Sequence, residues 1–157
     1  MPFSDFIFDS VEVAFNYVDG SNEGDIWLMS DVGGEPGAIL EAFHFFNRPR
    51  FDTTSNALAT GVSSLRPLLH GGTQYWVIAS ASGNAMMTFN LSTTGDLGNA
   101  LRTNGGPWNT FHDSRAAFRV NGTPAAVPEP ASLLLLATGG LGLLAKLRRR
   151  KKRHAQS

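Results

Sequence analysis

The stretch "VEVAFNYV", residues 11–18, decides the fold class because its side chains alternate in character. Val11, Val13, Phe15 and Tyr17 are apolar, whereas the positions between them are smaller or polar. An alternation with a period of two residues is typical of a β-strand with one face in the core and the other toward solvent. We therefore predict a half-buried strand here.

Similar short runs recur through residues 1–122, the predicted body of the protein, and turn-forming segments separate them. The runs include "FIF", "DIWLMSD", "AILEAFHFF", "YWVIASA", "AMMTFNL" and "AAFRV", and the turns include "DGSNEGD", "GGEPG", "HGGTQ" and "TTGDLGN". No segment before residue 131 keeps a helical period over three turns. Short strands with turns between them predict an all-β fold, an antiparallel β-sandwich of the jelly-roll type.

The segment "GEPG", residues 34–37, suits a β-turn. Proline presets φ near about −65° for the second position of a turn, and glycine adopts a positive φ without strain. We therefore place Pro36 at the second position of a turn and expect a positive φ at Gly37.

The segment "TQYWVIAS", residues 73–80, is predicted to form a central strand. Because alternate side chains of a strand point to opposite faces, one of two pairs faces the core. The pair is either Trp76 and Ile78 or Tyr75 and Val77. We favour packing in the core over a ligand platform for this strand.

Trp27 and Trp108 are also interpreted as packing residues. Exposed indole rings have a second use, because their flat apolar faces stack on the faces of sugar rings. A sugar-binding platform of exposed aromatic side chains therefore stays open as the alternative.

Charge divides the chain into two parts. The whole chain has thirteen Lys and Arg, thirteen Asp and Glu, and a formal net charge of zero. Seven of the cations lie within residues 146–153, so residues 1–145 hold six arginines, no lysine and all thirteen acids. An acidic body should avoid nucleic acid, whereas the basic end should bind anionic surfaces. The absence of cysteine excludes disulfides and thiolate metal sites.

The body has no set of side chains that points to catalysis or to a transition metal. His44, His70 and His112 lack the His-x-His and His-x-x-x-His spacings. "FHDS", residues 111–114, has the residue types of a catalytic triad, but neighbours in a strand point to opposite faces. The acidic "DGSNEGD", residues 19–25, is interpreted as a solvated turn, with weak calcium binding as the alternative. We expect no enzyme activity and no cofactor.

The end of the chain has three parts in order. Residues 123–130 form a linker whose three prolines fix φ and favour a stiff, extended spacer. The apolar run from Ala131 to Leu147 follows, interrupted only by Lys146, and a basic tail covers residues 148–157.

The apolar run is predicted to be a transmembrane helix at the lower limit of length. At about 1.5 Å per residue, residues 131–147 would span about 25 Å, against a hydrocarbon core of about 30 Å. Lys146 must therefore extend to the interface. A buried core helix and an aggregation-prone tail are the alternatives. Six basic residues behind the run are expected to stay in the cytoplasm, which places the body on the outer side of the inner membrane. They are Arg148, Arg149, Arg150, Lys151, Lys152 and Arg153.

The end "VPEPASLLLLATGGLGLLAKLRRRKKR", residues 127–153, resembles the PEP-CTERM protein-sorting signal. That signal joins a Pro-Glu-Pro motif, an apolar transmembrane stretch and an Arg-rich end, in this order. The resemblance implies that Pro128, Glu129 and Pro130 are the motif recognised by exosortase. This enzyme is an integral membrane protease-transpeptidase of Gram-negative bacteria that also make exopolysaccharide. The resemblance also implies that residues 131–147 span the membrane only until processing.

Three segments of the body, "DIWLMSDVGGEPGAILEAF", "LRPLLHGGTQYWVIASAS" and "AAFRVNG", are similar to PEP-CTERM cargo domains of the choice-of-anchor type. The similarity covers roughly residues 8–122. It implies a β-sandwich of the surface-protein type and transfers no catalytic residue.

These features together predict an exported cell-surface or extracellular matrix protein that exosortase processes, linked to exopolysaccharide and biofilm. The alternative is a surface carbohydrate-binding module, and a hydrolase is disfavoured because no nucleophile is paired with a base. The predicted partners are exosortase, inner-membrane lipid and exopolysaccharide, but not nucleic acid. The first residues lack the basic and apolar regions of a secretory signal, so we expect a signal peptide upstream of Met1, lost through truncation or a misassigned start.

Overall fold

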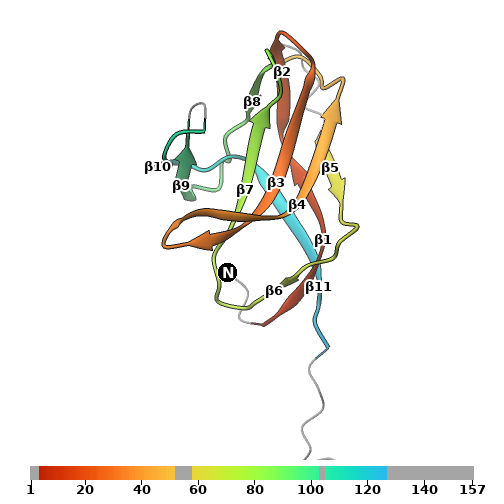
Figure 1. Ribbon diagram of the computed structural model, residues 1–157, viewed down its shortest axis with the longest axis vertical. Coiled ribbons are helices and arrows are strands. Elements are labelled where there is room, and N and C mark those ends of the chain that lie inside the picture. The colour runs from red at the N-terminus through yellow and green to blue at the C-terminus, as the bar shows by residue number, and fades with distance from the viewer. Residues whose placement is uncertain (1–3, 52–57, 103–104, 127–157) are drawn as a thin grey trace, which may run out of the picture. The chain divides into compact units, whose positions relative to one another are not determined.

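The computed structural model describes residues 4–51, 58–102 and 105–126, and in these ranges every regular element is a β-strand (Figure 1). The strands are β1 (Phe6–Val13), β2 (Phe15–Asp19), β3 (Glu23–Val32), β4 (Glu35–Phe46), β5 (Ala59–Val62), β6 (Leu68–Leu69), β7 (Tyr75–Ala81), β8 (Met86–Phe89), β9 (Leu97–Leu101), β10 (Asn109–Ser114) and β11 (Phe118–Pro124). The predicted all-β class is confirmed for this part of the chain. The predicted helix, residues 131–147, lies outside it.

The strands form two larger sheets and two smaller pairs, and these strands pair in antiparallel fashion. In the first sheet, β1 lies between β11 and β5 and also pairs with β6. The second sheet has the order β4-β3-β7, while β2 pairs with β8 and β9 pairs with β10. Because Val11 on β1 is opposite Val120 on β11, the first and last of these strands lie side by side.

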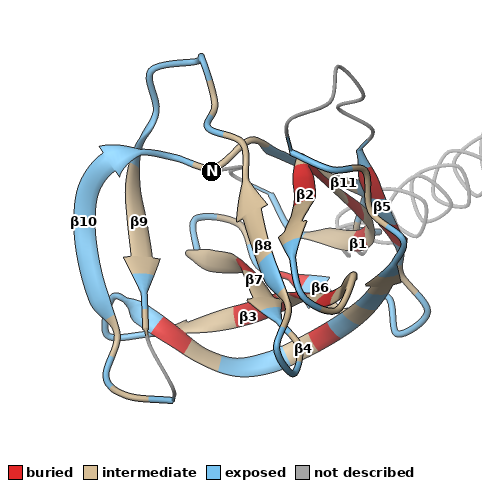
Figure 2. Ribbon diagram, turned by 90° about the horizontal axis from the view of Figure 1, so that it is seen from above, coloured by how far each residue is buried: buried red, intermediate tan, exposed pale blue. Residues whose placement is uncertain are grey.

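A cluster of buried apolar side chains joins the two larger sheets. Its members are Phe8, Val11, Val13, Phe15, Ile26, Leu28, Ala59 and Leu69. The ring of Phe43 on β4 approaches that of Phe8 on β1 with 6.2 Å between the ring centroids, so side chains of the two sheets meet directly. Full burial of one such side chain contributes about 1.5–3 kcal/mol. Figure 2 shows buried positions (red) on strands of both sheets.

Residues 11–18 form two strands rather than the one predicted. β1 ends at Val13, and β2 begins at Phe15 and pairs with β8, so the chain leaves the first sheet between them. The predicted alternation is confirmed for Val11, Val13 and Phe15, which are at most 1% exposed. Asn16 breaks the pattern because it is fully buried, at 0% exposed, where a solvent-facing side chain was predicted.

The predicted turn at Pro36 is wrong. The chain reverses at Gly33 and Gly34, where φ is 66° and 89°. Two successive positive φ values are typical of a two-residue hairpin turn, and glycine adopts them without strain. Pro36 instead lies within β4, opposite Asp31, and Gly37 is not among the residues with positive φ. β4 is an edge strand, the place in a sheet where a missing N–H is tolerated.

β11 continues beyond residue 122, where the body was predicted to end. Thr123 and Pro124, assigned above to the linker, form the last pairs with β1. The N–H of Ala125 then donates a hydrogen bond of 3.0 Å to the carbonyl of Asp5. The first part of the predicted linker is therefore held against the first sheet by backbone hydrogen bonds.

Candidate functional site

The predicted sorting residues lie outside the described residues. They are the motif Pro128, Glu129 and Pro130, the span from Ala131 to Leu147, and the basic residues 148–153. In the part of the chain that the structure describes, no helix is long and apolar enough to cross a membrane.

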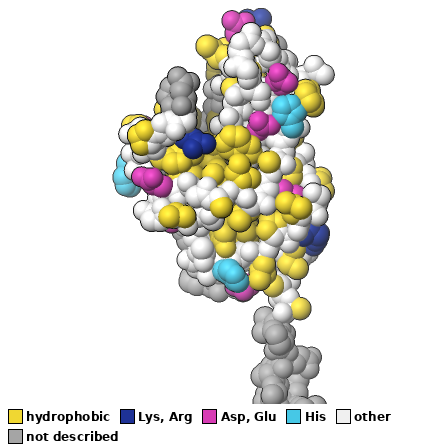
Figure 3. All heavy atoms as spheres, in the orientation of Figure 1, with side chains coloured by type: hydrophobic (Ala, Val, Ile, Leu, Met, Phe, Trp, Pro, Cys, Tyr) yellow, Lys and Arg dark blue, Asp and Glu magenta, His cyan; other side chains and the backbone are white. Residues whose placement is uncertain are grey.

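The three tryptophans of the chain line one region of the body. Trp76 lines a cleft of about 530 Å³, and Trp27 and Trp108 line a second cleft of about 310 Å³. Val77 and Ile78 line both clefts, which therefore adjoin along β7. Figure 3 shows apolar side chains (yellow) gathered over β3 and β7, with a cationic side chain (dark blue) at their edge.

β7 turns its two sets of side chains to different environments. Tyr75 and Val77 pack against the core cluster, as one of the two sequence alternatives predicted. Trp76 and Ile78 therefore lie on the other face of the sheet. Ile78 is opposite Trp27 in the register of β3 and β7, so the two tryptophans stand on neighbouring strands of the same face.

Two of the indole rings are held by polar groups. The Nε1–H of Trp76 donates a hydrogen bond of 2.8 Å to Oδ1 of Asp31, whose Oδ2 accepts the N–H of Gly34 at 3.0 Å. The guanidinium of Arg102 lies 4.5 Å from the ring centroid of Trp108. Such a cation–π contact contributes about 0.5–1 kcal/mol at an exposed site. Both rings are therefore restrained.

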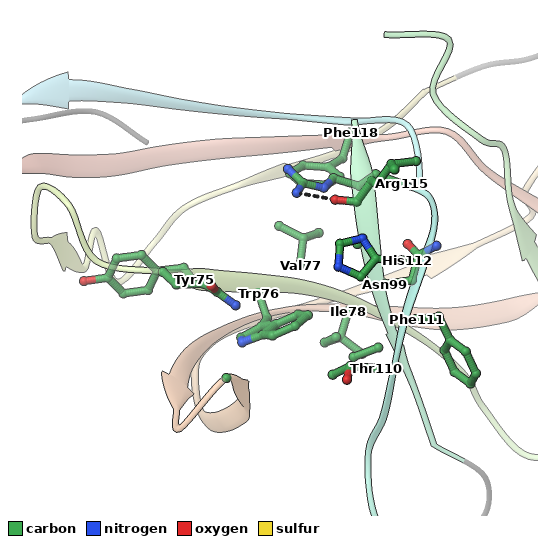
Figure 4. Close-up of a pocket in the computed structure, with 15 residues that line it drawn as sticks. Tyr75, Trp76, Val77, Ile78, Asn99, Thr110, Phe111, His112, Arg115 and Phe118 are labelled. Atoms are coloured by element: carbon green, nitrogen blue, oxygen red, sulfur yellow. Dashed lines mark hydrogen bonds between the residues drawn. The ribbon is translucent and has the colours of Figure 1, made fainter. Parts of the chain in front are cut away.

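The hairpin of β9 and β10 provides the facing wall of the larger cleft. Asn99, His112 and Arg115 line it, and Figure 4 shows Asn99 and His112 beside the side chains that project from β7. A guanidinium nitrogen of Arg115 donates a hydrogen bond of 2.9 Å to the carbonyl of Leu97, and Asn99 donates one of 2.7 Å to the carbonyl of Ser114. The side chains of Asn99 and Arg115 are thus fixed to the backbone of this part of the chain.

The charge of the clefts differs from that of the rest of the body. The described residues that line the two clefts include no Asp or Glu, but they include Arg102 and Arg115. Elsewhere, Arg66 and Arg119 each pair with a carboxylate, at 2.7 and 3.0 Å. Since Arg102 contacts a ring and Arg115 a carbonyl, neither positive charge is neutralised by a carboxylate in these contacts.

The three histidines named by the sequence do not come together. Nδ1 of His44 lies 2.5 Å from Oδ1 of Asp25, and this hydrogen bond raises the pKa of His44. Nδ1 of His70 lies 3.0 Å from a carboxylate oxygen of Asp5, while His112 lines the larger cleft. Among the described residues, no group of three or more His, Cys, Asp or Glu is placed to hold a metal ion.

Residues 126–151 match the PEP-CTERM protein-sorting motif. The chain therefore carries this sorting signal, which implies exosortase as its processing partner and a protein that is anchored in a membrane and then exported. No curated protein and no solved structure matches the chain. The similarity of the body to choice-of-anchor cargo domains is not confirmed.

Proposed function

We propose that this chain is a non-enzymatic protein of the cell surface or extracellular matrix that exosortase sorts through its C-terminal signal. The observation that carries the proposal is the sorting motif at residues 126–151, which follows a β-sheet body whose last strand ends at Pro124. A folded body followed by a short proline-rich linker and an apolar tail with a basic end is consistent with a substrate whose tail a membrane-embedded protease removes.

The proposed topology before processing has one membrane span. Residues 131–147 cross the inner membrane, the body lies in the periplasm, and the basic residues 148–153 lie in the cytoplasm. Moving a Lys or Arg into the centre of a membrane helix costs about 2.5–3.5 kcal/mol on insertion scales. Six adjacent cations therefore oppose transfer of the tail, and the body is released to the envelope or outside only after the tail is removed.

The motif itself suits recognition by a protease. Prolines favour an extended backbone, and proteins commonly bind peptides in extended form through main-chain hydrogen bonds. Because Pro128 and Pro130 restrict the backbone before binding, less conformational entropy is lost on binding. Glu129 adds one carboxylate that a cationic or hydrogen-bonding pocket can select.

We propose that the body folds as a β-sandwich of the jelly-roll type. The contact between Phe8 and Phe43 across the two larger sheets supports a two-layer arrangement. A role in biofilm, with exopolysaccharide as a partner, is part of this proposal and rests on the resemblance of the tail to the PEP-CTERM signal. Inner-membrane lipid is proposed as a partner because of the apolar run at residues 131–147.

The sorting proposal is tested by changing the motif in the full chain, expressed from its own gene in its host. In the variant with Pro128, Glu129 and Pro130 all replaced by alanine, we expect an uncleaved form to accumulate in the membrane fraction. Immunoblots of membrane, periplasmic and released fractions measure this outcome.

A matched control is Pro124→Ala, which removes a proline of the same segment but leaves the motif intact. It should be processed and released like the natural chain. Release of the triple variant at the same rate as this control would refute the sorting role of the motif.

A second candidate function is carbohydrate binding at the cell surface. The observation that favours it is the gathering of Trp27, Trp76 and Trp108 along two adjoining clefts. Ligand sites are concave, mostly apolar and bordered by a few placed polar groups. The two functions are compatible, because sorting uses the tail and binding uses the body.

A further inference from the structure

We propose that the two adjoining clefts form one binding groove, here named the tryptophan groove, for an acidic oligosaccharide whose sugar rings carry carboxylate groups. This proposal rests on the second function proposed above, carbohydrate binding, and narrows the ligand to acidic sugars. The groove runs along β7: this strand, with Trp27 of the neighbouring β3, forms the floor, and the β9–β10 hairpin with the residues around it forms the wall.

The floor of the groove offers flat apolar faces at fixed positions. Trp27 and Trp76 on the floor, and Trp108 on the wall, are each half-buried, so each residue keeps part of its surface exposed. The hydrogen bond to Asp31 fixes the plane of Trp76 before any ligand arrives. An aromatic ring that is already ordered loses little entropy on binding. Arg102 lies over Trp108, so an arginine accompanies this ring at the wall.

The wall offers polar groups that suit hydroxyl groups. Asn99, Thr110 and His112 line the larger cleft together with Gln74. Amide, hydroxyl and imidazole groups donate and accept hydrogen bonds, as the hydroxyls of a sugar require. Cleft volumes of about 530 and 310 Å³ lie within the usual range of ligand sites. The groove therefore combines stacking surfaces with hydrogen-bonding groups.

The charge of the groove selects an anionic ligand. Residues 1–145 hold thirteen acids and six arginines, yet the described lining of the groove holds two arginines and no acid. Arg102 and Arg115 contact a ring and a carbonyl, so their charges remain available to a ligand. Guanidinium groups bind carboxylates through paired, charge-assisted hydrogen bonds. A neutral sugar would leave these two charges uncompensated.

An acidic peptide would satisfy the arginines but would not present a series of flat rings to the indoles. A carboxylated sugar chain satisfies both requirements at once. Carbohydrate is therefore the occupant that the groove favours, and an acidic peptide serves as a competing probe in the test.

The test uses the purified full chain in detergent and three probes: a hexamer of galacturonic acid, the methyl-esterified hexamer, and poly-glutamate. The methyl ester removes the charge but keeps the sugar ring. Calorimetry measures affinity. Tryptophan fluorescence reports occupancy, because all three tryptophans line the groove. We expect the acidic hexamer to bind at least about tenfold more tightly than its ester.

The variants separate the groove from the rest of the surface. Arg102→Gln is expected to weaken binding of the acidic hexamer about tenfold, because one charge-assisted hydrogen-bond partner is lost. Arg102→Lys should weaken it less. The matched control is Arg119→Gln, which removes an arginine that pairs with Glu12 and does not line the groove. Arg115 also donates a hydrogen bond to the carbonyl of Leu97, so the folding of any Arg115 variant must be checked by far-UV circular dichroism.

Each possible result of the binding test decides one part of the proposal. Selective binding of the acidic hexamer that Arg102→Gln weakens and Arg119→Gln does not supports the proposal. If the methyl ester binds as tightly as the acidic hexamer, the groove still binds carbohydrate, but the proposal of an acidic ligand is refuted. If poly-glutamate binds as tightly as the acidic hexamer, the proposal that the groove is specific for carbohydrate is refuted. No sugar binding at about 1 mM would overturn the groove and the second function together, while the sorting proposal would stand.

Discussion

Gly61 on β5 lies against the ring of Phe43 on β4, so closely that a Cβ at residue 61 would come within 2.5 Å of Cγ of the ring. The two strands belong to different sheets. The Phe43 ring also packs against Phe8, which connects the glycine to the core. The sequence places glycine here because this contact leaves no room for a side chain.

Gly61→Ala should destabilise the body by about 1–3 kcal/mol, the range for forcing extra atoms into a packed core. Urea unfolding followed by fluorescence measures the change. The control is Thr60→Ala, on the exposed neighbouring position of β5, which should change stability by no more than about 0.5 kcal/mol. Equal effects of the two substitutions would refute a tight contact between the sheets at Gly61.

Asn16 links two parts of the chain through its buried amide. Its Nδ2 donates to the carbonyl of Pro49 at 3.2 Å, and its Oδ1 accepts from Nδ2 of Asn90 at 2.9 Å. Asn16→Ala leaves both partners unsatisfied, so we expect a loss of about 2–4 kcal/mol in the free energy of unfolding. The exposed Asn109→Ala provides the comparison. A loss below about 1 kcal/mol for Asn16→Ala would show that the network contributes little.

Glu41 is a second buried polar residue, at 4% exposed. It accepts hydrogen bonds from the hydroxyl of Ser63 at 2.5 Å and from the N–H groups of Ser64 and Leu65 at 2.6 and 3.1 Å. Burial raises the pKa of Glu41, but these hydrogen bonds outweigh burial and lower the pKa below its ordinary value of 4.5. The ionised carboxylate therefore stabilises the fold above pH 4.5, and this contribution is lost as pH falls through the lowered pKa.

Glu41→Gln should consequently destabilise the body by about 1–3 kcal/mol at neutral pH. The difference from the natural chain should shrink as the solution is acidified, because the natural carboxyl then becomes protonated. Urea unfolding at a series of pH values measures this difference, with the exposed Glu35→Gln as the control. A difference independent of pH would contradict the proposed role of the ionised carboxylate.

His44 should titrate above its ordinary pKa of 6.5, because the hydrogen bond to Asp25 favours the charged ring and outweighs desolvation. The stabilising contribution is complete below pH 6.5 and is lost as pH rises through the raised pKa. NMR titration of the ring protons should show a lower pKa for His44 in Asp25→Asn. Glu23→Gln, which removes a longer contact of 3.7 Å, should lower it less. An unchanged pKa in Asp25→Asn would contradict this assignment.

Many of the strands were predictable because local side-chain patterns determine them, but β5, β6 and β9 were not among the predicted runs. β9 begins at Leu97, inside the segment "TTGDLGN" that was predicted to be a turn. "YWVIASA" coincides with β7, and "DIWLMSD" lies within β3. The break between β1 and β2 was not predictable, because it depends on which sheet each half joins. The buried Asn16 was missed, and the turn within "GGEPG" was placed at Pro36 instead of at Gly33 and Gly34, for the same reason. Partners distant in the sequence satisfy the amide, and the strand register determined by β3 decides where the hairpin reverses.

The two candidate sites differ in how far the sequence reveals them. The sorting signal is a linear motif, so the order of its parts was enough to identify it at residues 127–153, and the family match at residues 126–151 confirms it. The tryptophan groove is assembled from strands that are distant in the sequence. The sequence indicated Trp27 and Trp108 as separate candidates for stacking on sugars. It could not predict that Arg102 and Arg115 bring positive charge to the same groove, because this depends on how the β9–β10 hairpin packs against β7.

The central claim is that the tail is a signal that exosortase removes, and the intact mass of the protein outside the cell tests it most directly. The account predicts a mass lower than that of the full chain, with residues 148–153 absent from the peptide map. A strain without exosortase should retain the full-length mass in its membranes. Recovery outside the cell of a chain that still carries Arg148 to Arg153 would contradict the account.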